Sequence, residues 1–183
     1  MTFAGCPIID VPISFDSEAK KVACQDQREG VRAHIAAERP DLVVMSNMYN
    51  YVAAMETPQE LRLYRWAFAT RDMASVARAA GSGFILVQSP PLGKPLSQCA
   101  VAGSTPADCV YSTTDVYADV AEAELSAVGE AAYVSTQEWF CVETKCPAFV
   151  GATPLKKDQV HLTKQYAAML QPLFSSAVRA VIE

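Results

Sequence analysis

An aspartate and a histidine three positions apart, Asp158 and His161, are the residues in this sequence best suited to acid–base chemistry. They lie in the stretch KKDQVHLTKQYAAML, just before a run with helical periodicity. A histidine that acts as a general base needs an acceptor, usually a carboxylate, on its second ring nitrogen. Because D-x-x-H is common by chance, the spacing alone favours a local capping role for Asp158, with a catalytic pair as the alternative.

No serine lies in a motif that marks a nucleophile, since neither G-x-S-x-G nor Gly-Asp-Ser occurs. Ser46 and Asn47 follow an expected buried strand, and ligands of parallel sheets bind where the strands end. Asn47 is therefore a candidate oxyanion-hole donor and Ser46 a candidate nucleophile, while turn formation is the alternative for both. Asn50 is a second candidate donor.

The six cysteines fall into three local pairs along the chain: Cys6 with Cys24, Cys99 with Cys109, and Cys141 with Cys146. None has the C-x-x-C spacing of a zinc ribbon, and two histidines supply a mixed zinc site poorly. Three disulfides, and therefore an oxidising compartment, are the favoured interpretation. Six buried free thiols in a cytosolic protein are the alternative.

Composition excludes several classes of protein. The net charge of −5 and the absence of a Lys/Arg cluster argue against nucleic-acid binding. No apolar run is long enough to span a bilayer. The sequence contains no P-loop, no G-x-G-x-x-G and no H-E-x-x-H, so neither a cofactor nor a metal is indicated.

Short apolar runs alternate with helical patterns, which predicts an α/β fold with a mostly parallel sheet. Strands are expected at 41–47, 83–91 and 131–136, and the end of another in FAGCPIIDV. Helices are expected at 18–38, 57–81, 115–128 and from 164 onward.

Two of these helices carry specific expectations. In the second, Thr57, Pro58 and Glu60 predict a capping box, and the apolar positions at helical spacing are Leu61, Tyr64, Phe68, Val76 and Ala79. In the last, Thr163 is the expected N-cap and Pro172 is expected to kink the helix or begin a second segment. Its expected apolar stripe is Tyr166, Leu170, Leu173, Ala177 and Val181.

The segment WFCVETKCPAFVGATPLKKDQVHLTKQYAAMLQPLF, from Trp139 to Phe174, places the D-x-x-H motif in a longer pattern. A C-x4-C-P hairpin precedes D-x-x-H-L-T-x-x-Y-A, and a helix holding Leu170 and Pro172 follows. The combination resembles the SGNH domain fused to the C-terminus of acyltransferase family 3 membrane proteins. The stretches GCP, PDLVVMSN and ILVQSPPLG, with the cysteines between and after them, agree in the same order.

The resemblance implies a flavodoxin-like three-layer fold over residues 1–183, located outside the cytoplasmic membrane. It implies a Ser-His-Asp triad in which His161 is the general base and Asp158 orients it. It also implies transfer of an acyl group, with acetyl as the favoured group, from an acyl donor to a cell-surface glycan. The implied partner is a membrane-embedded acyltransferase domain. An SGNH esterase is an alternative within the same chemistry.

The sequence departs from the family pattern at one point. The Gly-Asp-Ser block of the family precedes its G-C-P segment, whereas this sequence begins at G-C-P. We therefore expect the first strand, the serine and the following helix to be missing, and the chain alone to be inactive. A non-catalytic module that binds glycan or a partner is the alternative.

Overall fold

The computed structural model describes residues 5–182, without the side chain of Val181. Its contacts divide the chain into two compact units. The first comprises residues 1–89 and 119–134, and the second comprises residues 90–118 and 135–183.

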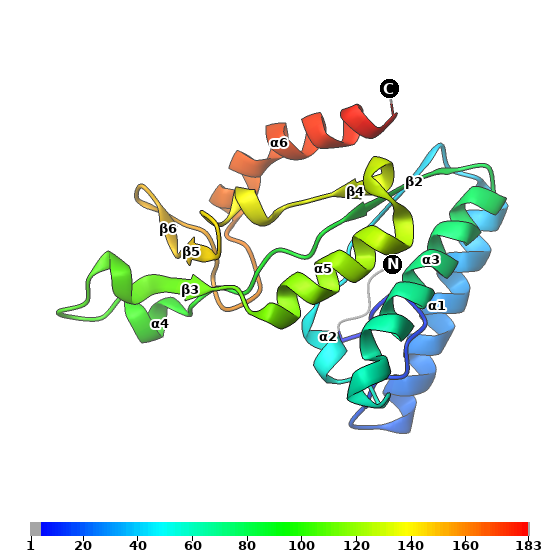
Figure 1. Cartoon of the computed structure of the whole chain (residues 1–183), viewed down its shortest axis with the longest axis horizontal. Helices are drawn as coiled ribbons and strands as arrows, with labels where there is room; N and C mark the ends of the chain where they lie inside the picture. Colours follow the sequence, from blue (N-terminus) through cyan, green and yellow to red (C-terminus); the bar gives the residue numbers. More distant parts are fainter. Residues whose placement is uncertain (1–4, 183) are drawn as a thin grey trace. The chain divides into compact units, whose positions relative to one another are not determined.

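The first unit contains a parallel sheet of three strands, two of which are labelled in Figure 1. Its strands are β1 (Leu42–Met45), β2 (Gly83–Val87) and β4 (Tyr133–Val134), in the order β1-β2-β4. Ile85 and Leu86 at the centre of β2 are fully buried, as expected for the middle strand of a parallel sheet. The expected strands and their parallel pairing are confirmed, so the chain has a mixed α/β fold with a small parallel sheet.

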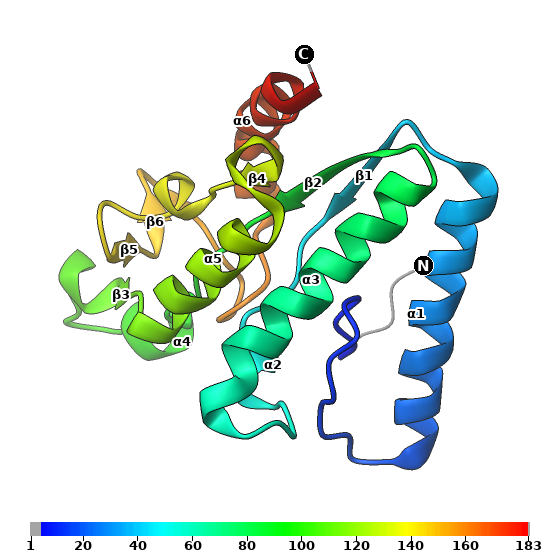
Figure 2. The same ribbon diagram turned by 45° about the vertical axis from the view of Figure 1, so that its right-hand side comes forward.

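Helices account for most of the rest of this unit. They are α1 (Glu18–Glu38), α2 (Asn50–Ala53), the 3₁₀ turns η1 (Gln59–Leu61) and η3 (Glu130–Ala132), α3 (Arg62–Ala79), and α5 (Asp115–Val128) from residue 119 onward. Helix α1 begins at the N-cap Ser17, whose Oγ accepts from Lys20 N at 3.3 Å. It ends at Arg39 in the left-handed conformation, before Pro40, which cannot continue a helix. Figure 2 shows α1 and α3 side by side.

The face of α3 that is buried is not the one predicted. Leu61, Tyr64 and Phe68 are exposed by 48%, 67% and 54%. The buried face carries Trp66, Ala69, Thr70, Met73, Ala74 and Ala77. Besides Trp66 and Met73, this face carries small residues that let it approach its neighbours closely, whereas the spacing of Leu61, Tyr64 and Phe68 pointed to the opposite face. The prediction was wrong because it weighted size and hydropathy above fit.

The expected capping box of α3 is also not formed. The first turn is η1, whose N-cap is Pro58 with no side-chain hydrogen bond. The backbone carbonyl of Thr57 instead accepts a hydrogen bond from Arg62 Nε at 3.0 Å. A capping box does occur in the second unit, where Thr105 and Asp108 bond reciprocally at the start of η2 (Pro106–Cys109).

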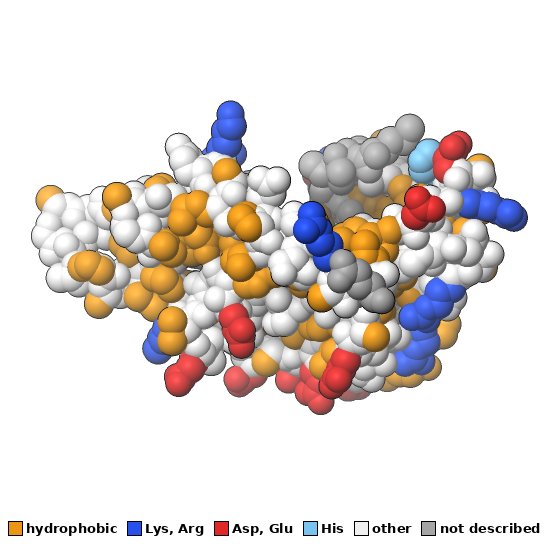
Figure 3. All heavy atoms as spheres, turned by 90° about the horizontal axis from the view of Figure 1, so that it is seen from above, with side chains coloured by type: hydrophobic (Ala, Val, Ile, Leu, Met, Phe, Trp, Pro, Cys, Tyr) orange, Lys and Arg blue, Asp and Glu red, His pale blue; other side chains and the backbone are white. Residues whose placement is uncertain are grey.

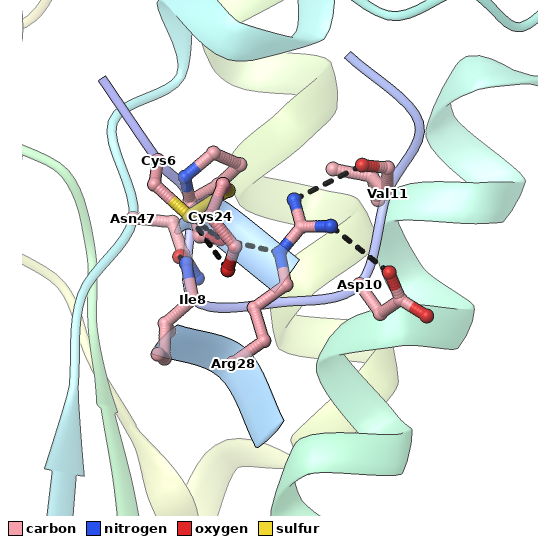
Figure 4. Close-up of a disulfide and its surroundings, with 8 residues drawn as sticks. Cys6, Ile8, Asp10, Val11, Cys24, Arg28 and Asn47 are labelled. Atoms are coloured by element: carbon pink, nitrogen blue, oxygen red, sulfur yellow. Dashed lines mark hydrogen bonds and ion pairs between the residues drawn. A yellow bond between two sulfur atoms is a disulfide. The ribbon is translucent and has the colours of Figure 1, made fainter. Parts of the chain in front are cut away.

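The segment before α1 has no regular strand among its described residues, although a further strand was expected to end there. A disulfide joins Cys6 to Cys24 of α1. The buried guanidinium of Arg28 donates to the carbonyls of Pro7 and Val11, each at 3.0 Å, and to Asp10 Oδ1 at 2.9 Å (Figure 4). These bonds give an irregular segment the partners that a strand would have found in a sheet.

The second unit contains little regular structure apart from one long helix. Two antiparallel pairs join β3 (Val110–Ser112) to β5 (Lys145–Pro147) and β6 (Phe149–Val150) to β7 (Thr153–Pro154). The short helical segments are α4 (Leu96–Cys99), η2 and η4 (Gln137–Trp139). The disulfides Cys99–Cys109 and Cys141–Cys146 lie in this unit, so the three expected pairings are confirmed.

Helix α6 (Lys164–Ile182) closes the chain. Thr163 caps it as predicted, since its Oγ1 accepts from Tyr166 N at 3.1 Å. Tyr166 and Leu170 pack into a core with Phe140, Cys141, Cys146 and Leu155. The helix continues through Pro172 as one element, and Leu173, expected in the buried stripe, is 48% exposed. Figure 3 shows hydrophobic side chains at the surface in orange.

No helix among residues 5–182 has the combination of length and apolar character that crossing a bilayer requires.

The buried carboxyl group of Glu124, on α5, lies at the centre of a polar network in the first unit. Its Oε1 accepts from Trp66 Nε1 at 3.0 Å and its Oε2 accepts from the Tyr49 hydroxyl at 2.7 Å. Tyr49 and Tyr133 bond each other through their hydroxyl groups at 3.3 Å. Burial raises the pKa of Glu124 from 4.5 to about 7, although both hydrogen bonds oppose the shift.

The buried Glu124 predicts a loss of stability as pH rises. Because its pKa is higher in the folded state, the unfolded state loses this proton first, between about pH 4.5 and 7. We expect the free energy of unfolding to fall by about 3 kcal/mol over this range, and Glu124→Gln to remove the decline. Urea unfolding at a series of pH values measures it. The exposed Glu122→Gln is the matched control on the same helix, and an unchanged slope in Glu124→Gln would contradict the prediction.

Candidate active site

Asp158 and His161 form a directly hydrogen-bonded pair in the second unit. Asp158 Oδ2 lies 2.8 Å from His161 Nδ1. Asp158 Oδ1 accepts from the backbone N–H groups of Val160 and His161, each at 2.8 Å. The capping and catalytic interpretations are therefore compatible, because one oxygen closes the turn while the other contacts the ring.

The ionised form of Asp158 is strongly favoured. Hydrogen bonds from the backbone N–H groups of His161 and Val160, and then from the His161 ring, hold the pKa of this carboxyl well below its ordinary value. A carboxylate on Nδ1 selects the tautomer with the proton on that nitrogen and leaves the lone pair on Nε2. The side chain of His161 is 69% exposed, and Nε2 has no hydrogen-bond partner among the described residues. The His161 ring is thus held in a state in which Nε2 can accept a proton from another molecule.

A short closed loop holds this pair. Lys157 N donates to the His161 carbonyl at 2.8 Å, and Lys156 and Leu162 form an isolated antiparallel bridge. Thr163 then begins α6 and donates from its hydroxyl to the Pro154 carbonyl at 2.6 Å. The histidine therefore sits between a closed loop and a capped helix, both of which restrict its backbone.

Lys156 holds this loop in place through hydrogen bonds from its side chain. Its side chain is buried, and Nζ donates to the carbonyls of Pro91 and, at 3.3 Å, of Gln159. The same nitrogen lies 5.8 Å from the centre of the Phe140 ring, within the range of a cation–π contact. Burial lowers the pKa of Lys156 to about 8, while the charge of Asp158 partly opposes the shift.

Gly93 brings a second backbone segment against the loop. Its N–H donates to the Gln159 carbonyl at 2.8 Å. A Cβ at this position would lie 2.8 Å from Lys156 Cδ, which is closer than real Cβ contacts allow. The glycine is therefore required by the space that the buried lysine stem occupies.

The oxyanion-hole candidates belong to the first unit. Asn47 is buried, and its Oδ1 accepts from Ile8 N at 3.2 Å, so the side chain holds the segment before α1. Its Nδ2 is buried without a partner among the described residues, which leaves a donor unused. Ser46 is exposed, and Asn50 is exposed at the start of α2.

Sequence reasoning missed the residues that support the candidate pair. Lys156 and Gly93 belong to no motif, although both lie in loops already singled out, beside Asp158 and in the PPLG stretch. The sequence does not show that the two loops meet, through the buried Lys156 side chain and through the hydrogen bond from Gly93 N to the Gln159 carbonyl. Among the described residues, no group of three or more His, Cys, Asp or Glu side chains is placed to hold a metal ion.

Comparison with known proteins shows the family to which the chain belongs. A family model described as the SGNH domain fused to AT3 domains matches residues 1–176. The chain belongs to this family. No curated protein and no solved structure matches it. An SGNH domain of this type accompanies AT3 acyltransferase domains, and the three disulfides favour a location outside the cytoplasm.

The tautomer of His161 tests the contact with Asp158. At a pH where the ring is neutral, we expect His161 of the SGNH domain to carry its proton mainly on Nδ1, because the carboxylate accepts from that nitrogen. Asp158→Asn should reduce this preference. Long-range ¹H–¹⁵N correlation spectra of the imidazole rings measure it, with the exposed His34 as internal control. Identical spectra for His161 in both proteins would refute the contact.

Gly93→Ala tests the support beneath the loop. The new Cβ must displace the buried Lys156 stem, so we expect a loss of about 1–3 kcal/mol in the free energy of unfolding. Urea denaturation measures it. Gly30→Ala in α1 is the control, since a Cβ there meets nothing within 4 Å and should stabilise the helix by about 0.5–1 kcal/mol. Equal stabilities for Gly93→Ala and the parent would mean that the loop is not held in this way.

Proposed function

We propose that this SGNH domain transfers an acyl group to a hydroxyl group of a cell-surface glycan. Acetyl is the favoured acyl group. The observation that carries the proposal is the hydrogen bond between Asp158 Oδ2 and His161 Nδ1. It joins a histidine whose second ring nitrogen is free to a carboxylate held in its charged form. That is the arrangement a general base of acyl transfer requires.

In the proposed reaction a serine Oγ attacks the carbonyl carbon of the acyl donor, and His161 Nε2 takes the serine proton. His161 then gives this proton to the leaving group, and an acyl-serine is formed. In the second half, Nε2 takes the proton of a glycan hydroxyl as that oxygen attacks the acyl group. The proton then returns to the serine. Asp158 remains ionised and stabilises the imidazolium in both halves.

We assign the serine to a Gly-Asp-Ser block of the intact protein, because the 183 residues contain no such motif. Asn47 stays a sequence-based candidate for an oxyanion-hole donor; its Nδ2 is a buried donor without a partner among the described residues of the first unit. The proposed partner is a membrane-embedded AT3 domain that delivers the acyl group, and the proposed location is the periplasm or the cell surface. An esterase would use the same steps with water in place of the glycan hydroxyl.

A module that only holds glycan or docks to a membrane partner is the second candidate function. Such a module would not need the His161 proton to be on one particular ring nitrogen. Its ligand binding would be insensitive to His161→Ala, whereas acyl transfer would not.

Two measurements test the proposed chemistry. The chain alone should hydrolyse a p-nitrophenyl ester no faster than background. In cells that carry the intact protein, His161→Ala should abolish O-acetylation of the surface glycan, and Asp158→Asn should reduce its rate by about 10²- to 10⁴-fold. The acetate released from purified glycan by mild base measures the product.

His34→Ala is the matched control, because His34 is an exposed helical residue of the other unit. Normal acetylation in His161→Ala would overturn the proposal. Ester hydrolysis by the chain alone that is lost in His161→Ala would instead show that a serine within these residues, such as Ser46, is the nucleophile.

A further inference from the structure

A cleft of about 520 Å³ lies in the first unit, between α1, α3 and the segment that precedes α1. It is lined by residues of the two neighbouring helices seen in Figure 2 and, from the segment before α1, by residues 10–13 and Phe15, which form its floor. All of its lining residues belong to one unit. A volume of this size suits a small ligand.

The cleft is held in shape by bonds that do not depend on a ligand. Arg28 fixes the floor through the carbonyls of Pro7 and Val11, as Figure 4 shows. Arg32 of α1 pairs with Asp72 of α3 at 2.5 Å, which ties the two walls together. A preformed site loses little conformational entropy when it binds a ligand.

An exposed aromatic surface forms part of one wall. Phe68 lines the cleft and stacks on Tyr64, with ring centres 6.5 Å apart and an interplanar angle of 28°. The two side chains are 54% and 67% exposed, although both are large and apolar. This is the α3 face that the sequence predicted to be buried. An apolar surface at the edge of a cleft indicates a ligand with an apolar face of its own.

The charges of the cleft balance. Basic and acidic side chains line it in equal number: Lys21, Arg28, Arg32 and Arg65 against Asp10, Glu29, Glu56 and Asp72. Arg28 and Arg32 are paired with Asp10 and Asp72. Arg65 and Glu56 have no ion-pair partner among the described residues and supply opposite charges. Because these charges sum to zero, the cleft offers no net attraction to a polyanion. It also repels a polyanion less than an acidic cleft would.

We propose that this cleft binds one or two pyranose rings of a neutral saccharide. A pyranose ring presents a face of C–H groups, which packs against the electron-rich face of an aromatic ring such as Phe68. Its hydroxyl groups both donate and accept, so they match a carboxylate and a guanidinium together, here Glu56 and Arg65. The inference stands apart from the acyl-transfer proposal, because none of these residues takes part in that reaction.

Titration of the ¹⁵N-labelled 183-residue chain with cellobiose, maltose, lactose and N,N′-diacetylchitobiose tests the inference. We expect at least one of them to shift the backbone amide signals of the α1 and α3 residues around the cleft, with a Kd of about 1 mM. Phe68→Ser should weaken binding by about fivefold to tenfold, and Arg65→Gln by about tenfold or more. Both positions are exposed, so the fold should be retained.

Val22→Ser is the matched control, since Val22 is 48% exposed on α1 and does not line the cleft. Its binding should equal that of the parent chain. The absence of any amide chemical-shift change with all four saccharides at up to about 50 mM would overturn the inference. So would shifts caused by inorganic phosphate or by glycine alone, which would identify an anion or a zwitterion site. Equal weakening by Val22→Ser and Phe68→Ser would place the contact outside the cleft.

Discussion

Irregular backbone in a protein interior must find hydrogen-bond partners for its carbonyl groups, and in both units a buried cation provides them. Arg28 binds the carbonyls of Pro7 and Val11, and Lys156 binds those of Pro91 and Gln159. Burying a cation without an equally buried carboxylate beside it costs free energy. Each of these two cations offsets that cost by donating hydrogen bonds to several oxygen atoms. One buried cation therefore helps to hold the segment around each candidate site.

The same dependence explains how an exposed pair such as Asp158 and His161 can be ordered. Neither residue gains much from burial, and the unit that carries them has few strand bonds. Order comes instead from Lys156 under the loop, from Gly93 beside it, and from the capped start of α6 behind it. Groups in the interior thus hold the exposed Asp158–His161 pair in position.

Much of the local structure followed from the sequence, because it rests on local rules. The strands at Leu42–Met45 and Gly83–Val87, the cap at Thr163 and the pairing of neighbouring cysteines were predictable. The buried face of α3 was not, since close packing of Ala74 and Ala77 outweighed the large residues opposite. Lys156 and Glu124 were also missed, because a charged residue gives no sign in sequence that it is buried.

Each disulfide joins two cysteines that are consecutive among the six in the chain. Within these 183 residues, Cys24 is the next thiol to follow Cys6 along the chain, and Cys109 is the next to follow Cys99. The same holds for Cys146 and Cys141. Each cross-link can therefore close within a continuous segment of the chain, with no cysteine of another pair between its two thiols.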